Sequence, residues 1–185
     1  MIKPDVILSA GHYSASKGFC VDGLCEYPLT KEWAEAIGVA LPHNRVVAFA
    51  PDADLKTKIA LINKSAPRLA VEIHFNASVA AASGSETLHS TSKASIYAAT
   101  YVQARLGKMV LPDRKTKVGY YQGDPKKGVL PFLKDTTCPA VIVEVCFLKD
   151  YLGSVAALKD QVVKQIAAGI EDFLKLNDAA NGSIK

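Results

Sequence analysis

The chain has 185 residues, of which 49% are hydrophobic and 22% charged, a size and composition typical of one globular domain. The formal net charge is +4, and the lysines and arginines are neither gathered in one run nor interleaved with aromatic residues, so we do not expect a nucleic-acid partner. No stretch approaches the ~18–20 apolar residues of a membrane-spanning helix, so stable membrane insertion is not expected either.

The N-terminal stretch carries one lysine and an apolar run shorter than the ~7–15 residues of a secretory signal. We therefore expect synthesis in the cytoplasm without a signal peptide, and a target outside the membrane would require a partner that lets the protein through. Cytoplasmic synthesis favours four reduced thiols, at Cys20, Cys25, Cys138 and Cys146. Cys20 and Cys25 are close enough to form a disulfide, but the sequence leaves this open.

Strand and helix patterns alternate along the chain. Short apolar or alternating runs predict strands over residues 5–9, 45–50, 69–75, 86–90 and 140–145. Apolar residues at helical spacing predict helices over 27–41, 54–65 with Asp54 as N-cap, and 155–176. A further helix is predicted to start at Ser92 or Thr91 as its cap and to reach Gly107. Residues 108–128 lack a clear hydrophobic period and are interpreted as an irregular segment on the surface.

This alternation predicts an α/β fold: a single domain with a twisted, mostly parallel central sheet and helices on both faces. We assign residues 1–176 to this domain. Residues 177–185 are interpreted as a polar, frayed C-terminal tail.

Polar and apolar residues alternate along residues 71–78. Glu72, His74 and Asn76 share one face of the predicted strand, and Val71, Ile73 and Phe75 share the other. Unpaired buried polar groups cost roughly 1–3 kcal/mol each, so these side chains need partners.

Other stretches offer such partners. His12 follows the first predicted strand, Glu144 lies near the end of the last, and Glu26 opens a helix. In parallel sheets, sites form at the carboxyl ends of the strands, so these groups and His74 should lie at one edge. Taken singly, each has a simpler explanation, such as a turn histidine, a helix-dipole partner for Glu26 or a lysine partner for Glu144.

Two histidines and one carboxylate are the usual protein ligands of a hydrolytic zinc site, and a further carboxylate can transfer protons. His12, Glu26 and His74 are therefore the candidate Zn²⁺ ligands, and Glu144 is the candidate general base and acid.

Four local motifs support this interpretation: S-A-G-H at 9–12, G-L-C-E at 23–26, I-H-F-N-A at 73–77 and P-A-V-I-V-E-V-C-F at 139–147. In content and order they resemble the zinc-dependent N-acetylmuramoyl-L-alanine amidase family, often called amidase 3, over roughly residues 5–175. The resemblance implies that His12, Glu26 and His74 bind zinc and that Glu144 is the catalytic residue. It also implies that the substrate is peptidoglycan, cleaved between N-acetylmuramic acid and L-alanine.

The chain departs from the family pattern at several positions. Glu72 replaces a small polar residue, and it is predicted either to orient His74 or to form a simple ion pair. Asn76 and Glu86, the latter in G-S-E-T-L at 84–88, are further candidates for contacts with a ligand or the substrate. Cys146 stands where the family has glycine, either near the metal on the face of Glu144 or as a small buried hydrophobe.

A phage endolysin, released by a holin-type membrane-perforating partner, fits this sequence best, and a lytic enzyme of a spore-forming mother cell fits next. Two alternatives remain: a zinc peptidase that cuts within the stem peptide, and a non-catalytic wall-binding protein descended from an amidase. A serine hydrolase is disfavoured because the chain has no G-x-S-x-G elbow.

Overall fold

The computed structural model describes residues 3–77 and 82–182. Its centre is a six-stranded sheet in the order β4-β1-β5-β8-β6-β7. All neighbouring strands in this sheet are parallel except β6 and β8. The strands are β1 (Val6–Ala10), β4 (Val47–Phe49), β5 (Leu69–Asn76), β6 (Ser85–His89), β7 (Asp113–Val118) and β8 (Ala140–Phe147). The predicted α/β fold with a mostly parallel sheet is confirmed.

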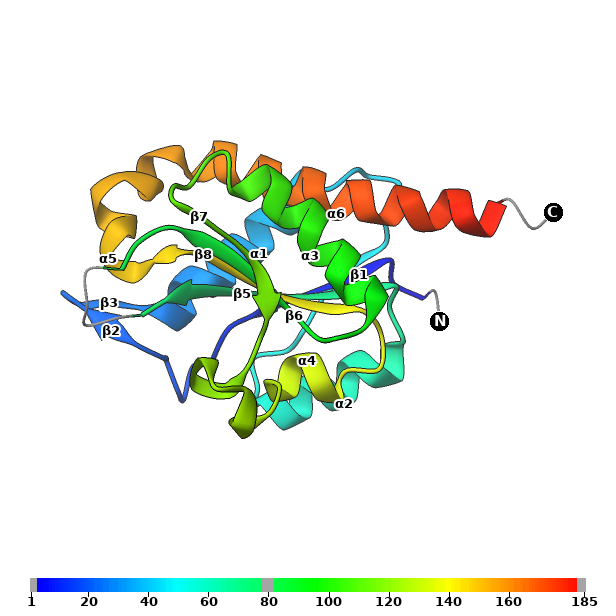
Figure 1. Cartoon of the computed structure of the whole chain (residues 1–185), viewed down its shortest axis with the longest axis horizontal. Coiled ribbons are helices and arrows are strands. Elements are labelled where there is room, and N and C mark those ends of the chain that lie inside the picture. Colours follow the sequence, from blue (N-terminus) through cyan, green and yellow to red (C-terminus); the bar gives the residue numbers. More distant parts are fainter. Residues whose placement is uncertain (1–2, 78–81, 183–185) are drawn as a thin grey trace.

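Helices cover both faces of the sheet (Figure 1). One face packs against α1 (Glu26–Ala40), α3 (Lys93–Leu106) and α6 (Lys159–Gly182), and the other against α2 (Leu55–Ser65) and α4 (Pro131–Asp135). Trp33, Phe75 and Phe173 are buried in the larger core on the α1 side. Among the described residues, no helix is both long and apolar enough to cross a membrane.

Side-chain caps fix two helix starts where the sequence predicted them. The Asp54 carboxylate accepts a hydrogen bond from the Thr57 backbone N–H at 2.8 Å, and Ser92 accepts one from Ser95 at 3.2 Å. Such caps satisfy backbone donors that have no partner inside the helix.

The segment 108–128 is more ordered than predicted, because it contains β7 and two short turns, η1 (Tyr121–Gly123) and η2 (Pro125–Lys127). β7 is an edge strand of sequence D-R-K-T-K-V. An edge strand with one apolar residue has no hydrophobic period for sequence analysis to detect.

The end of the chain also differs from the prediction. Residues 148–158 form short irregular turns, namely α5 (Leu148–Asp150), η3 (Tyr151–Val155) and η4 (Ala156–Leu158), so α6 starts at Lys159 rather than Val155. It continues to Gly182 and thus includes residues assigned to a frayed tail. Asp178 lies in that part of the helix and forms ion pairs with Arg45 and Arg68, which gives these residues a reason to stay helical.

Two expectations about cysteines are wrong. Cys20 and Cys25 face each other across the hairpin of β2 (Cys20–Val21) and β3 (Leu24–Cys25), with Cα atoms 4.0 Å apart, and form a disulfide. Cys146 does not share the face of Glu144: the register between β5 and β8 shifts after Glu144, and Cys146 is buried in the α1-side core. The alternative interpretation of Cys146 as a small buried hydrophobe is confirmed.

Candidate metal centre

The candidate ligands come from three places at one edge of the sheet. His12 follows β1, Glu26 is the first residue of α1, and His74 lies near the end of β5. Glu144 on β8 is the direct neighbour of His74 across the sheet. The predicted convergence of these residues at the carboxyl ends of parallel strands is confirmed.

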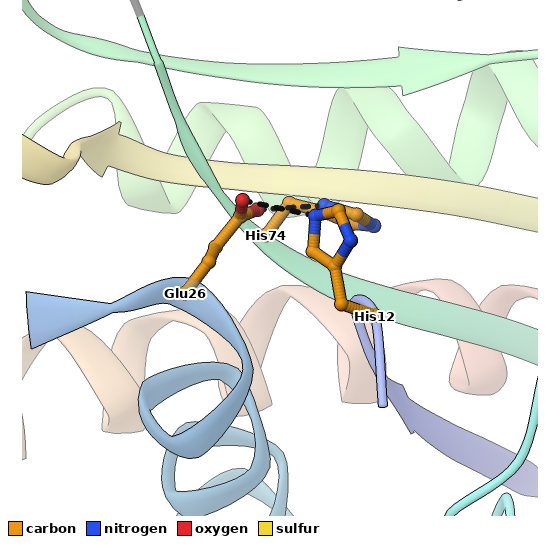
Figure 2. Close-up of side chains that lie close together, drawn as sticks. All are labelled: His12, Glu26 and His74. Carbon is orange, nitrogen blue, oxygen red and sulfur yellow. Dashed lines mark hydrogen bonds and ion pairs between the residues drawn. The ribbon is translucent and has the colours of Figure 1, made fainter. Parts of the chain in front are cut away.

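The Glu26 carboxylate faces both histidines and contacts each of them (Figure 2). One oxygen is 2.9 Å from His12 Nε2, and the other is 2.9 Å from His74 Nδ1. The two imidazole rings are edge to face, with centroids 5.2 Å apart. One ligand atom from each residue lies within 4.8 Å of the others, so the group can hold a metal ion.

The electrostatics of this group keep Glu26 ionised. Burial alone would raise the pKa of Glu26, but hydrogen bonds from His12 and His74 outweigh it and lower the pKa to about 2. Burial would lower the pKa of His74, but hydrogen bonds to Glu26 and Glu72 outweigh it, and this pKa lies well above its ordinary value. Without a metal, the anionic Glu26 carboxylate is thus paired with a protonated His74, and a divalent cation bound here would replace the His74 proton.

Glu72 supports His74 from the side away from Glu26. Its Oε1 is 3.0 Å from His74 Nε2, and its Oε2 accepts a hydrogen bond from the Ser9 hydroxyl at 3.0 Å. His74 Nδ1 is therefore left to face Glu26 and the ligand group. A carboxylate on the second nitrogen is the usual way in which proteins orient a metal-binding histidine.

Glu144 is the unusual member of the group. Its Oε2 is buried and has no hydrogen-bond partner among the described residues. Burial raises its pKa to about 7; the positive charge of His74 opposes this shift, and the carboxylates of Glu26, Glu86 and Glu72 add to it. A carboxyl group with a pKa near neutrality can both accept and donate a proton.

Asn76 and Glu86, the remaining candidates, form a cluster of their own beside Glu144. Asn76 Nδ2 donates to Glu86 Oε1 at 3.0 Å, and Glu86 Oε2 pairs with Arg114 and Lys117. These contacts join them to one another and to the two cations, so the structure places them next to the candidate centre rather than in it.

Sequence analysis missed the groups that shape the loop around His12. Lys58 of α2 is 2% exposed, and its ammonium donates to the carbonyl oxygens of Ala10, at 2.5 Å, and of His12. The available signal was its position one helical turn before buried Ile62, on the core-facing side of α2.

Two glycines leave room for the candidate ligands. A Cβ on Gly11 would lie 2.5 Å from the His74 ring, and one on Gly18 would lie 2.5 Å from the His12 ring and 2.7 Å from Glu26. Both positions therefore exclude a side chain. Gly18 also has a φ of 73°, which side-chain-bearing residues rarely adopt.

The donor set fits zinc. Imidazole nitrogens and a carboxylate oxygen are ordinary zinc ligands, and bonds of ~2.0–2.2 Å can be made to atoms held this close together. The three residues converge from separate elements onto one point, and the glycines and Lys58 fix the backbone around it.

Comparisons with known proteins identify the family of the chain. A family model described as N-acetylmuramoyl-L-alanine amidase matches residues 6–175. No match was found among curated protein sequences.

Solved structures share the fold. The N-acetylmuramoyl-L-alanine amidase from Clostridium difficile 630 is similar with a TM-score of 0.79 and 22% identity, over 94% of this chain and 98% of that one. The catalytic domain of the amidase CwlV from Bacillus (Paenibacillus) polymyxa var. colistinus has a TM-score of 0.77 and 22% identity, over 92% and 97%. The catalytic domain of the CD27L endolysin targeting Clostridia difficile has a TM-score of 0.69 and 23% identity, over 91% and 97%. Because the family model spans almost the whole chain, this protein belongs to the N-acetylmuramoyl-L-alanine amidase family.

Proposed function

We propose that the protein is a zinc-dependent amidase that hydrolyses the bond between the lactyl group of N-acetylmuramic acid and the first L-alanine of the peptidoglycan stem peptide. One observation carries this proposal: three ligand atoms converge within 4.8 Å of one another beside a buried Glu144 oxygen that has no partner among the described residues. An unpaired buried carboxylate is costly, and a substrate or water that exchanges protons with it explains why it is there.

Each residue then has a distinct role. His12, Glu26 and His74 would hold the zinc ion, and Glu72 would keep the His74 ring in place. Bound zinc supplies a Lewis acid that polarises the scissile carbonyl and makes water more acidic. Glu144 takes the proton from the attacking water and delivers it to the leaving alanine nitrogen, which its pKa of about 7 permits.

Metal content and reaction products test this proposal together. We expect about one zinc per chain in the wild type and in Glu144→Ala. Purified peptidoglycan should release new L-alanine amino termini with the wild type, while Glu144→Ala should lose at least about 100-fold in rate. Glu35→Gln, on the exposed side of α1, is the matched control and should keep full activity.

Other products would contradict the proposal in recognisable ways. New amino termini from residues further along the stem peptide would identify a peptidase. Binding to peptidoglycan without any new amino terminus would identify a wall-binding protein. Full activity of Glu144→Ala would remove Glu144 from the mechanism.

We extend the proposal to wall lysis, with a holin-type partner that releases the enzyme from the cytoplasm. The support is the fold that the chain shares with an endolysin catalytic domain. Expression inside bacteria should cause lysis when a membrane-perforating protein is co-expressed, and Glu144→Ala should abolish that lysis. Lysis without the perforating protein would contradict the need for such a partner.

A further inference from the structure

Two cations converge on one carboxylate beside the candidate metal centre. Arg114 Nε and Lys117 Nζ lie 2.8 Å and 2.6 Å from the same oxygen of Glu86. In a regular strand, residues three apart point to opposite faces of the sheet. Here the pairing of β6 with β7 shifts register between Ser85 and Thr87, and Lys115 has a φ of 68°. This bulge turns both cations to the side of Glu86.

The bulge is costly for the residue that forms it. A lysine in the left-handed region is disfavoured by roughly 1–2 kcal/mol, and such strain persists mainly where the surrounding structure requires it. A simple ion pair with Glu86 needs only one cation. The backbone of β7 is thus arranged to bring a second positive charge to this place.

The position relative to Glu144 is set by the strand register. Glu86 on β6 is the direct antiparallel neighbour of Glu144 on β8, so it lies about one strand spacing, ~4.8 Å, away. β7 follows on the other side of β6, which places Arg114 and Lys117 about two strand spacings, ~10 Å, from Glu144. An extended peptide covers this distance in about three residues.

The charges of Glu86, Arg114 and Lys117 do not cancel. Glu86 neutralises one of the two cations, and the other positive charge remains. The Arg114 guanidinium lies over the Phe147 ring, 5.2 Å from its centroid, which holds its plane in place. Within the described part of the chain, its Nη atoms form no hydrogen bond, and the side chain is 33% exposed. A held guanidinium with free N–H donors is suited to a carboxylate.

A hollow of about 320 Å³ adjoins the cluster and shares Asn76 and Phe147 with it. Its walls are mostly apolar, and they come from the disulfide-bonded hairpin and the residue before it, from the ends of β5 and β8, and from the start of α5. The lining residues are Phe19, Val21, Asn76, Ala77, Phe147, Leu148 and Lys149. An apolar hollow with cations at one border matches a short peptide that carries small side chains and a carboxylate.

We propose that Arg114 and Lys117 bind a free carboxylate of the peptide part of the substrate, within about three residues of the scissile amide. The enzyme would thereby distinguish peptides with a free carboxylate from those in which it is converted to a carboxamide. This inference rests on the proposed amidase function and names a specificity determinant for it. Glu86 acts as a positioning residue, since it holds both cations, and Asn76 orients Glu86 through its hydrogen bond.

The test compares two muramoyl-peptides that differ only in whether their peptide carboxylates are free or amidated. We expect the wild type to cleave the free form with at least about tenfold higher kcat/KM, through a lower KM. Arg114→Gln and Arg114→Gln/Lys117→Gln should lose this preference stepwise, because the KM for the free form should rise more than the KM for the amidated form. Lys126→Gln, an exposed lysine of η2, is the matched control and should keep the preference.

The amidated substrate separates the possible failures. Equal cleavage of both substrates by the wild type would overturn the carboxylate site and leave the amidase function standing. Equal loss on both substrates in Arg114→Gln would show that the cluster only supports the fold, and would also overturn the inference. Cleavage of neither substrate by the wild type would overturn the proposed function, and the inference with it.

Discussion

At the scale of single residues, the candidate centre depends on an unusual backbone conformation at His12. Its φ is 63°, in the left-handed region that side-chain-bearing residues rarely enter. The Lys58 ammonium donates to the carbonyl oxygens of Ala10 and His12 and thereby holds the loop on both sides of Gly11. Burial lowers the pKa of Lys58, and the nearby carboxylates of Glu72 and Asp52 oppose this shift. The lysine thus supplies a positive charge where backbone carbonyls converge.

Lys58→Met should uncouple the loop from α2 while keeping most of the buried side-chain volume. We expect zinc affinity and kcat/KM to fall about 10–100-fold, because supporting contacts of this kind fix ligand orientation. A competing chelator measures the affinity, and circular dichroism confirms that the fold is retained. Lys56→Met, at an exposed position of the same helix, should change neither quantity. Unchanged zinc affinity in Lys58→Met would show that His12 holds its conformation without this contact.

The raised pKa of Glu144 leads to a prediction about stability that does not depend on activity. In the metal-free protein its pKa is raised from 4.5 to about 7, so between these values the folded state binds a proton that the unfolded state has lost. Wild-type stability therefore falls as pH rises through this range, by about 3 kcal/mol from this group.

Glu144→Gln removes that titration. Relative to the wild type, the metal-free variant should gain about 3 kcal/mol in unfolding free energy between about pH 4 and about pH 8. Urea denaturation at both pH values, in the presence of a chelator, measures the difference. A gap between variant and wild type that stays constant with pH would contradict the raised pKa.

At the scale of elements, the β2–β3 hairpin links a disulfide to the metal centre. Cys25 directly precedes Glu26, and the Phe19 backbone N–H donates to Glu26 Oε2 at 3.3 Å. Gly18 packs where any side chain would meet His12 and Glu26. The hairpin therefore forms one wall of the site, and its covalent closure restricts how far that wall can move.

Cys20→Ser/Cys25→Ser should lower the unfolding free energy by about 2 kcal/mol, because the unfolded chain regains the freedom that the short disulfide loop removes. Reductant should lower the stability of the wild type to the same level. The double variant is its own control, since reductant should not affect it. Urea denaturation with and without reductant makes the comparison, and equal stability of all four samples would contradict a folded-state disulfide.

Elements with a strong hydrophobic period could be predicted from sequence, and those without one could not. β5 and β8 alternate or run apolar for eight residues each, and both were found within two residues of their ends. β7 was missed because an exposed edge strand needs few apolar residues. Cys146 was misplaced because a register shift, which follows from the pairing of β5 with β8, reverses the side-chain alternation after Glu144.

At the scale of the whole molecule, the site and the main ion-pair network lie at opposite edges of the sheet. The candidate ligands follow the carboxyl ends of the strands, whereas Asp5, Arg45 and Arg68 precede β1, β4 and β5. The convergence of His12, His74 and Glu144 could be predicted from strand direction alone. The network could not, because Asp178 reaches Arg45 and Arg68 only once α6 is packed along the sheet, as Figure 1 shows.

The candidate ligands lie at the carboxyl ends of the strands and the ion pairs of Asp178 at the amino ends. This separation predicts that the end of α6 affects stability and not catalysis. Arg45 pairs with Glu171 at 2.8 Å and with Asp178 at 2.9 Å, and Arg68 pairs with Asp178 at 2.8 Å and with Asp5 at 2.7 Å. Asp178→Asn should cost about 1 kcal/mol of unfolding free energy, since Asp178 is 48% exposed and solvent weakens its ion pairs.

Truncation after Leu176, the predicted domain boundary, should cost at least as much as Asp178→Asn, because it removes the same carboxylate together with the last helical turns. Both variants should keep the zinc content and kcat/KM of the wild type. Hydrogen bonds from Arg45 lower the pKa of Asp178, so its contribution is complete above the ordinary aspartate range and is lost as pH falls through the lowered value. The gap between Asp178→Asn and the wild type should therefore close in acid. A fall in kcat/KM at full zinc content would instead show that the two edges of the sheet are coupled through α6.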